Sequence, residues 1–254
     1  MEYKNFKMEK ALEKIIIFIK AIYLIKNAKN YFLDYLGKLK KNYIISLRGG
    51  LKIILRGGTT DRQIFNDIYL RKEYLFKKIN KKSVVLDIGS HIGLFSLYLS
   101  KKVKKIICFE PSEENFKIFE KNIELNKIKN IELYNKAVYP STNKVNLFTG
   151  SANHAGFSLV EKTNTFQEVE TFHPKNVFKL NKNITVIKMD CEGSEFFIFP
   201  YLNFKFLEEI IFEYHLFNNE ITDLNNIIQK LRAEGFNIKI KRYSNKLGII
   251  YARK

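Results

Sequence analysis

Three carboxylates fall within six residues directly after an apolar run in the second half of the chain, in Lys188-Met189-Asp190-Cys191-Glu192-Gly193-Ser194-Glu195. Grouped carboxylates at the end of a strand cost desolvation free energy unless they bind a cation, a sugar hydroxyl or one another. Such crowding also tends to raise the pKa of at least one carboxyl group. The spacing therefore predicts a general base here, with Asp190 and Glu192 as candidates. Glu195 has a structural alternative, because helix N-termini favour acidic residues.

A second polar cluster, Glu213-Tyr214-His215, closes the next apolar run. His215 is a candidate base because histidine titrates near neutral pH, and a hydrogen-bonded structural histidine is the alternative. His91, His154 and His173 are weaker candidates. Four hard ligands for magnesium or manganese stand in these two clusters, but no set of residues has convincing metal spacing, so no metal is predicted.

A glycine-containing loop, Asp87-Ile88-Gly89-Ser90-His91-Ile92-Gly93, follows the apolar run 84–86 and precedes a helical pattern. A buried strand that leads through such a turn into a helix can hold a mononucleotide. A dinucleotide fingerprint would need glycine where His91 stands, and the Asp87 carboxylate would repel a diphosphate. That carboxylate suits the ammonium and sulfonium groups of S-adenosylmethionine, while Glu110, after the apolar run 106–109, suits a ribose diol. An ordinary strand-turn-helix without a ligand is the alternative.

Strand-like and helical patterns alternate from Ser83 onward, which is typical of a parallel sheet covered on both faces. We predict an α/β fold with a doubly wound, mostly parallel Rossmann-like sheet, an antiparallel hairpin at its end and a helical N-terminal extension. The expected domains are 1–80, helices with a short hairpin at 43–56, and 81–254. The predicted strands are 84–86, 106–109, 131–134, 186–189 and 210–213, with a helix at 115–126 and a final hairpin of 237–242 and 247–252. Another helix should run from Thr59 or Thr60 to about Ile79, and the irregular insertion 140–185 should overhang the ligand crevice.

The composition of the chain indicates which partners and which cellular compartment are expected. The net charge of +18 would suit a protein that binds the phosphates of nucleic acid. Only seven of the 44 basic residues are arginine, the residue best suited to phosphate recognition, so nucleic acid is a disfavoured partner. Cys108 and Cys191 both lie in apolar segments, which indicates reduced thiols in a cytoplasmic protein. Lys20 interrupts the apolar N-terminal segment 11–26, so we expect no membrane span. That segment should pack on the main domain or across a homodimer, with peripheral membrane contact as the alternative.

These residues resemble the FkbM-type methyltransferases, which share a class I S-adenosylmethionine-dependent fold. The resemblance covers about residues 83–215. The strand motif K-x-D-x-E-G-x-E is specific, whereas the glycine loop alone is not. The matching pieces, in the family's order, are VVLDIGSHIGLFSLYLS (84–100), FEPSEENFKIFEKNIELN (109–126), KAVY (136–139), NHAGFSL (153–159), VIKMDCEGSEF (186–196) and IIFEYH (210–215).

The resemblance implies O-methylation of a hydroxyl on a glycan, a sugar-containing lipid or a natural product. An RNA methyltransferase and a catalytically inactive cofactor-binding scaffold stay open as alternatives. Asp190 and Glu192 would face the methyl group and the acceptor. Carried over by position, the cofactor site would comprise Asp87, Gly89 and Gly93 for the methionine part, Glu110 for the ribose and Ala137-Val138 for the adenine, with Ser90, His91, Pro111 and Asp190 beside them. The chain departs from the family pattern at His91 and His154, which puts the acceptor in question more than the cofactor.

Overall fold

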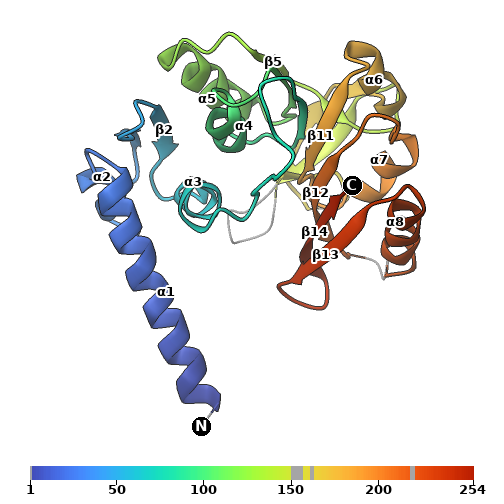
Figure 1. The fold of residues 1–254 in the computed structure, drawn as a ribbon. Helices are drawn as coiled ribbons and strands as arrows, with labels where there is room; N and C mark the ends of the chain where they lie inside the picture. Colours follow the sequence, from blue (N-terminus) through green and yellow to red (C-terminus); the bar gives the residue numbers. More distant parts are fainter. Residues whose placement is uncertain (1, 150–156, 161–162, 218–220) are drawn as a thin grey trace. The chain divides into compact units, whose positions relative to one another are not determined.

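The structure is a computed structural model that describes residues 2–149, 157–160, 163–217 and 221–254 (Figure 1). Side chains are described from residue 12 onward, except those of Thr149 and Phe157. His154 and the rest of 153–156 therefore lie outside the described residues. The chain divides into two compact units, one of residues 1–75 with 121–127 and one of residues 76–120 with 128–254.

The first unit contains the predicted N-terminal helices and hairpin. Its elements are α1 (Glu2–Leu24), α2 (Lys29–Tyr35), β1 (Asn42–Ser46), β2 (Lys52–Arg56), α3 (Asp61–Phe65) and the π-helix η1 (Asn66–Arg71). Strands β1 and β2 pair antiparallel, as the glycines between them predict. Among the described residues, no helix combines the length and apolar composition that crossing a membrane requires.

The helix predicted from Thr59 or Thr60 ends earlier than expected. Thr60 is the N-cap residue but makes no side-chain capping bond, while the Thr59 hydroxyl before it accepts from Asp61 N at 3.2 Å. The helical segment stops at Arg71 instead of about Ile79. Further along, Lys77 N and Lys78 N donate to Glu209 Oε2 at 2.8 and 2.9 Å. The helix ends where Lys72 adopts a left-handed conformation with φ +58°. Backbone groups that bond to a distant carboxylate cannot also make helical hydrogen bonds, so the contact with Glu209 keeps residues 77 and 78 out of a helix.

The second unit is built on a seven-stranded sheet of order β13-β14-β12-β11-β3-β4-β5. The five strands from β12 to β5 run parallel, and β14 pairs antiparallel with both β12 and β13. The predicted parallel sheet and final hairpin are confirmed. The strands are β3 (Val84–Ile88), β4 (Lys105–Phe109), β5 (Ile131–Tyr134), β11 (Ile184–Met189), β12 (Glu209–His215), β13 (Asn237–Arg242) and β14 (Leu247–Arg253).

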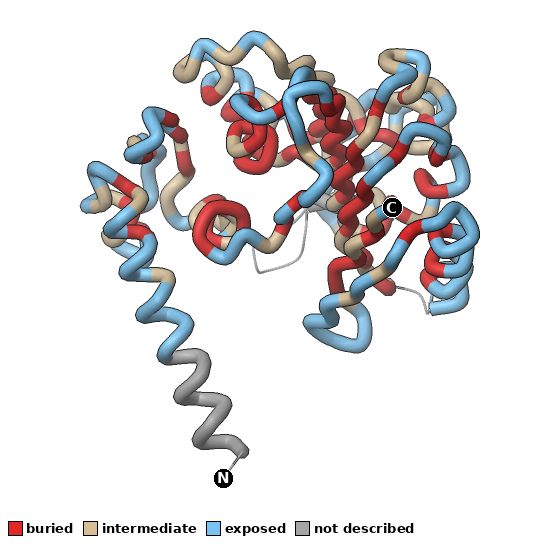
Figure 2. The backbone as a smooth tube through the Cα atoms, in the orientation of Figure 1, coloured by how far each residue is buried: buried red, intermediate tan, exposed pale blue. Residues whose placement is uncertain are grey.

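Helices cover both faces of this sheet, with α4 on one side and α7 and α8 on the other (Figure 1). They are α4 (Leu94–Leu99), α5 (Glu113–Leu125), α6 (Val177–Leu180), α7 (Glu195–Ile198) and α8 (Ile221–Ala233), with 3-10 turns η2 (Pro174–Asn176) and η3 (Phe199–Tyr201). The central strands are buried along their length (Figure 2), because a parallel sheet between two helical layers has no solvent-facing side.

The segment 140–185 is more regular than predicted. Strands β7 (Val145–Thr149), β8 (Phe157–Ser158) and β9 (Phe166–Val169) form a small antiparallel sheet, and β6 (Ala137–Val138) pairs parallel with β10 (Thr171–Phe172). Leu147 and Val169 face a small core while their polar neighbours face outward. Strands this short give too few alternations to be distinguished from irregular chain by sequence, so the prediction of an irregular insertion was wrong in this respect.

Candidate functional site

The glycine loop joins β3 to α4 and touches the end of β11. Gly89 has φ +76°, and a side-chain carbon there would collide with the Asp190 carbonyl oxygen. Asp190 N in turn donates to Ile88 O at 3.0 Å. Gly93 has φ +85°, and a side chain there would meet the Phe119 ring. Glycine is therefore required at both positions, and the loops after β3 and β11 are held against each other.

Asp87 is fully buried at the end of β3. Ser96 Oγ donates to Asp87 Oδ2 at 2.6 Å, and Lys188 Nζ lies 3.4 Å from Oδ1. Burial raises the pKa of the Asp87 carboxyl, while the Lys188 charge and the Ser96 hydrogen bond oppose the increase. These contacts join Asp87 to the neighbouring strand β11 and to helix α4, and its predicted contact with the cofactor stays a prediction.

Lys188 is the residue that the sequence reasoning left without a role. Its ammonium donates to Gly89 O at 2.7 Å and lies 3.9 Å from Asp190 Oδ2. Although burial lowers the pKa of Lys188, the Asp87 and Asp190 carboxylates outweigh it and raise that pKa. The side chain is thus a buried cation that connects the two loops. A lone lysine inside the apolar strand Ile184–Met189 was the available signal.

Glu110 follows β4, and its carboxylate accepts hydrogen bonds from the glycine loop and from the residues that follow β4. Its Oε2 accepts from His91 N at 2.8 Å, and its Oε1 accepts from Ser112 N at 3.0 Å and from Asn115 Nδ2 at 3.2 Å. Burial raises the pKa of this carboxyl, against the effect of these hydrogen bonds. Because β3 and β4 are paired neighbours, Glu110 and Asp87 close adjacent strands, as the sequence predicted. Each carboxylate oxygen has two acceptor positions, so those bonds leave capacity for a ribose hydroxyl.

The other predicted cofactor positions lie nearby with different exposure. Ser90 is buried, and its hydroxyl donates to Asp87 O and Phe109 O, whereas His91 and Pro111 are half-buried. Ala137 and Val138 are buried in β6, and their side chains pack into hydrophobic clusters. Any contact of these two residues with adenine would therefore have to use the backbone.

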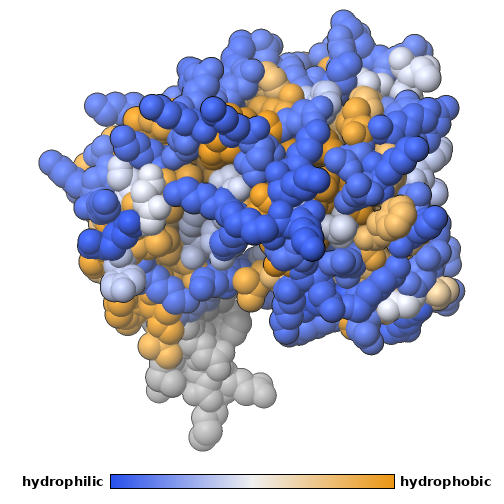
Figure 3. Space-filling model, turned by 45° about the horizontal axis from the view of Figure 1, so that its top comes forward, coloured by the Kyte–Doolittle hydropathy of each residue, from blue (hydrophilic) through white to orange (hydrophobic). Residues whose placement is uncertain are grey.

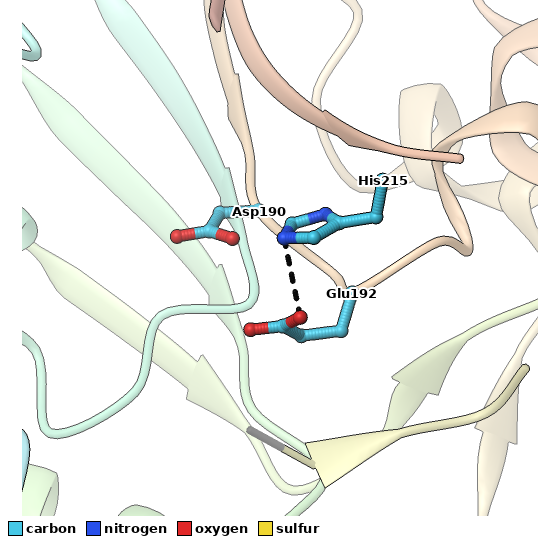
Figure 4. Close-up of side chains that lie close together, drawn as sticks. All are labelled: Asp190, Glu192 and His215. Atoms are coloured by element: carbon cyan, nitrogen blue, oxygen red, sulfur yellow. Dashed lines mark ion pairs between the residues drawn. The ribbon is translucent and has the colours of Figure 1, made fainter. Parts of the chain in front are cut away.

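Asp190, Glu192 and His215 converge at the ends of β11 and β12 (Figure 4), where one ligand atom from each lies within 4.8 Å of the others. His215 Nε2 lies 3.2 Å from Glu192 Oε2. The side chains of Asp190 and Glu192 are 30% and 32% exposed, so a ligand can reach them. Glu192 has φ +53°, an uncommon conformation for a residue with a side chain. The three predicted catalytic residues therefore share one partly open cluster, whose ligand types also suit a divalent cation.

His215 is held as a cation by its surroundings. Burial lowers its pKa, but the Glu195 contact and the Glu192, Glu195 and Asp190 charges together raise that pKa to about 10. At neutral pH the imidazole carries a proton on each nitrogen. A protonated imidazole cannot take a proton from an acceptor, so His215 in this state orients and balances the carboxylates.

Glu195 has the structural role that the sequence offered as an alternative. It is fully buried, and its oxygens accept from Cys191 N at 2.7 Å and Gly193 N at 2.9 Å. These bonds shape the turn that carries Glu192. The predicted insertion reaches the same turn, because Ser158 Oγ of β8 donates to Glu192 O at 2.7 Å. His173, the weaker candidate, accepts from Lys175 N at the start of η2 and has a local structural contact.

A family model described as the methyltransferase FkbM domain matches residues 87–238. Methyltransferase 1 of Beauveria bassiana is 23% identical over 157 residues, which cover 52% of this chain and 63% of that protein. A tRNA (guanine(37)-N(1))-methyltransferase of Plasmodium knowlesi is 32% identical over 101 residues, which cover 38% of this chain and 14% of that protein. The chain thus spans less than two thirds of the length of either relative.

One solved structure, SMU.1697c from Streptococcus mutans in complex with SAH, superposes with a TM-score of 0.50 at 14% identity. The match covers 74% of this chain and 97% of the other. At this level of identity the likeness concerns the fold alone. It agrees with the strand order of the second unit, which is that of a class I methyltransferase.

Proposed function

The chain belongs to the FkbM methyltransferase family, whose cofactor is S-adenosylmethionine, and we propose that it transfers the methyl group to a hydroxyl of a glycan, a sugar-containing lipid or a natural product. The observation that carries the choice of a hydroxyl is the cluster of Asp190, Glu192 and His215 beside the glycine loop. An alcohol has to lose its proton as it attacks carbon, and carboxylates within reach supply a base for that step.

The residues around the glycine loop fit the cofactor. Gly89 and Gly93 keep side chains out of the loop, and Glu110 retains acceptor positions at the end of β4. The site is rich in carboxylates, which suits a ligand carrying sulfonium and ammonium groups. In our proposal Ser90, His91 and Pro111 line the same end of the sheet, and Asp87 acts through the loop that it supports.

The charges in the cluster indicate a role for each of its three residues. When bound, S-adenosylmethionine supplies a methyl group already activated by its sulfonium. Asp190 or Glu192 accepts the hydroxyl proton as the oxygen–methyl bond forms. His215, protonated at neutral pH, holds Glu192 by the 3.2 Å contact and limits repulsion between the carboxylates. We therefore assign His215 to positioning and the two carboxylates to proton transfer.

The acceptor would be recognised by the segment that follows β6. Ser158 contacts the Glu192 turn, and the Val160 side chain lies within van der Waals reach of a side chain built at Gly193. We place the reaction in the cytoplasm, since Cys108 and Cys191 are free thiols and Cys108 is buried.

RNA methylation is the second candidate, since the net charge is +18 and one relative is a tRNA methyltransferase. The two candidates are separated by incubating the protein and labelled S-adenosylmethionine with glycan, glycolipid and hydroxylated small-molecule extracts and, separately, with RNA. We expect label in a hydroxyl-bearing compound and none in RNA. Salt-sensitive labelling of RNA alone would reject the proposed acceptor class while leaving the methyltransferase assignment intact.

A further inference from the structure

Helix α1 presents an uncharged apolar surface to solvent. Seven large apolar side chains of α1, each between 42% and 80% exposed, form this surface: Leu12, Ile15, Ile16, Phe18, Ile19, Ile22 and Tyr23. At 3.6 residues per turn they occupy a continuous arc of about 160°. We call this set the α1 apolar arc. In Figure 3 hydrophobic side chains, drawn in orange, adjoin the grey start of the helix.

The other side of α1 attaches the helix to its own unit. Ala21 is completely buried, Lys20 Nζ donates to Leu70 O at 2.9 Å, and Glu13 pairs with Arg71 at 2.8 Å. Phe18, at one edge of the arc, contacts the Phe32 ring of α2 at a centroid distance of 4.5 Å. The arc therefore points away from the part of the first unit that holds the helix. A surface of this kind indicates an interaction site.

The charges beside the arc identify the partner. On the helical wheel, Lys14 and Lys20 stand about 40° beyond its two edges, and Glu13 is paired with Arg71. The first unit contains 18 Lys and Arg against 8 Asp and Glu, a net charge of +10. Two copies that joined their arcs would bring two units of net positive charge together. An anionic lipid surface offers the opposite charge and an apolar layer.

The composition of the helix limits its orientation. Among the described residues, no helix is long and apolar enough to cross a bilayer, whose hydrocarbon core is about 30 Å thick. We propose that α1 lies flat on an anionic membrane surface, with the α1 apolar arc in the lipid and Lys14 at the headgroups. This inference does not depend on the identity of the methyl acceptor.

Vesicle co-sedimentation tests the proposal, with phosphatidylcholine vesicles that contain or lack phosphatidylglycerol. The test variant is Ile15→Glu/Ile19→Glu. The matched control is Leu36→Glu/Ile44→Glu, which removes two exposed apolar side chains elsewhere in the same unit and adds the same charge. Circular dichroism and thermal melting of all three proteins establish that each is folded.

We expect the wild type and the control to sediment with the anionic vesicles, and the test variant to bind roughly tenfold or more weakly. Added salt should weaken the wild-type binding, because the lysine contribution is screened. Equal binding to vesicles without phosphatidylglycerol would overturn the proposal, as would an equal loss in the control. Absence of vesicle binding together with a wild-type dimer that Ile15→Glu/Ile19→Glu dissociates would also overturn it and assign the arc to a second copy.

Discussion

Acidic side chains lie at both ends of β12, and the two ends differ in burial and in hydrogen-bond partners. At the start of the strand, Glu209 is fully buried, accepts two backbone N–H groups and pairs with Arg253. At its end, His215 lies within 4 Å of Glu192, Glu195 and Glu213, in a cluster that is partly exposed. A carboxylate that is fully matched by donors stabilises a fold. Several carboxylates around one cation leave negative charge and access for a ligand.

The largest effect should come from the catalytic end. Asp190→Asn or Glu192→Gln removes a proton acceptor without changing side-chain size, and we expect turnover to fall about 10²- to 10⁴-fold for whichever residue is the base. Cofactor affinity, measured by calorimetry, should change little. The exposed Glu168→Gln serves as the control. If neither cluster variant lowers turnover, proton transfer by these carboxylates is wrong.

A substitution at Glu209, at the start of β12, should lower the stability of the fold. Glu209→Gln leaves Arg253 without its partner carboxylate, and we expect the free energy of unfolding to fall by about 3 kcal/mol, measured by urea denaturation. The folded fraction should keep its kcat. A kcat loss as large as that of the Asp190 variant, in fully folded protein, would contradict a purely structural role for Glu209.

Lys188 should affect cofactor binding more than turnover. Lys188→Met removes the cation that bonds to Gly89 O and accompanies Asp87, so we expect about tenfold weaker cofactor binding. Lys105→Met is the matched control, because Lys105 of strand β4 pairs with Glu132 where both side chains are partly exposed. Unchanged cofactor affinity in Lys188→Met would show that the loop is held by its backbone contacts alone.

His215 should give stability a pH dependence. The pKa of His215 is raised from 6.5 to about 10 in the folded protein, so its stabilising contribution is complete below pH 6.5 and is lost as pH rises toward 10. The difference in unfolding free energy between the wild type and His215→Gln should therefore shrink steadily between pH 6.5 and 9. A difference that grows over this range would have the wrong sign for a histidine held as a cation.

Much of the fold was predictable because its signals are local. The apolar runs at Val84, Ile106 and Ile210 each became a buried strand, and the hairpin glycines marked a real turn. That residues 77 and 78 lie outside a helix was not predictable, since their backbone N–H groups bond to Glu209, more than 130 residues away in the sequence. Local patterns contain no information about such a contact.

The site was predictable in its members but not in their states. Asp190, Glu192 and His215 were placed together because the carboxyl ends of parallel strands share one edge of a sheet. That His215 is a cation depends on how carboxylates from two strands pack around it, which spacing cannot specify. For the same reason, the contacts of Asp87 with Lys188 and Ser96 in the interior could not be predicted from spacing.

The atom that receives the methyl group tests the proposed hydroxyl acceptor most directly. Incubation with S-adenosylmethionine labelled with ¹³C in the methyl, followed by NMR of the product, distinguishes methyl on oxygen from methyl on nitrogen or carbon. We predict an O-methyl signal with the wild type that is lost with whichever of Asp190→Asn and Glu192→Gln removes the base. An N-methyl or C-methyl product, or an undiminished O-methyl signal in both variants, would contradict it.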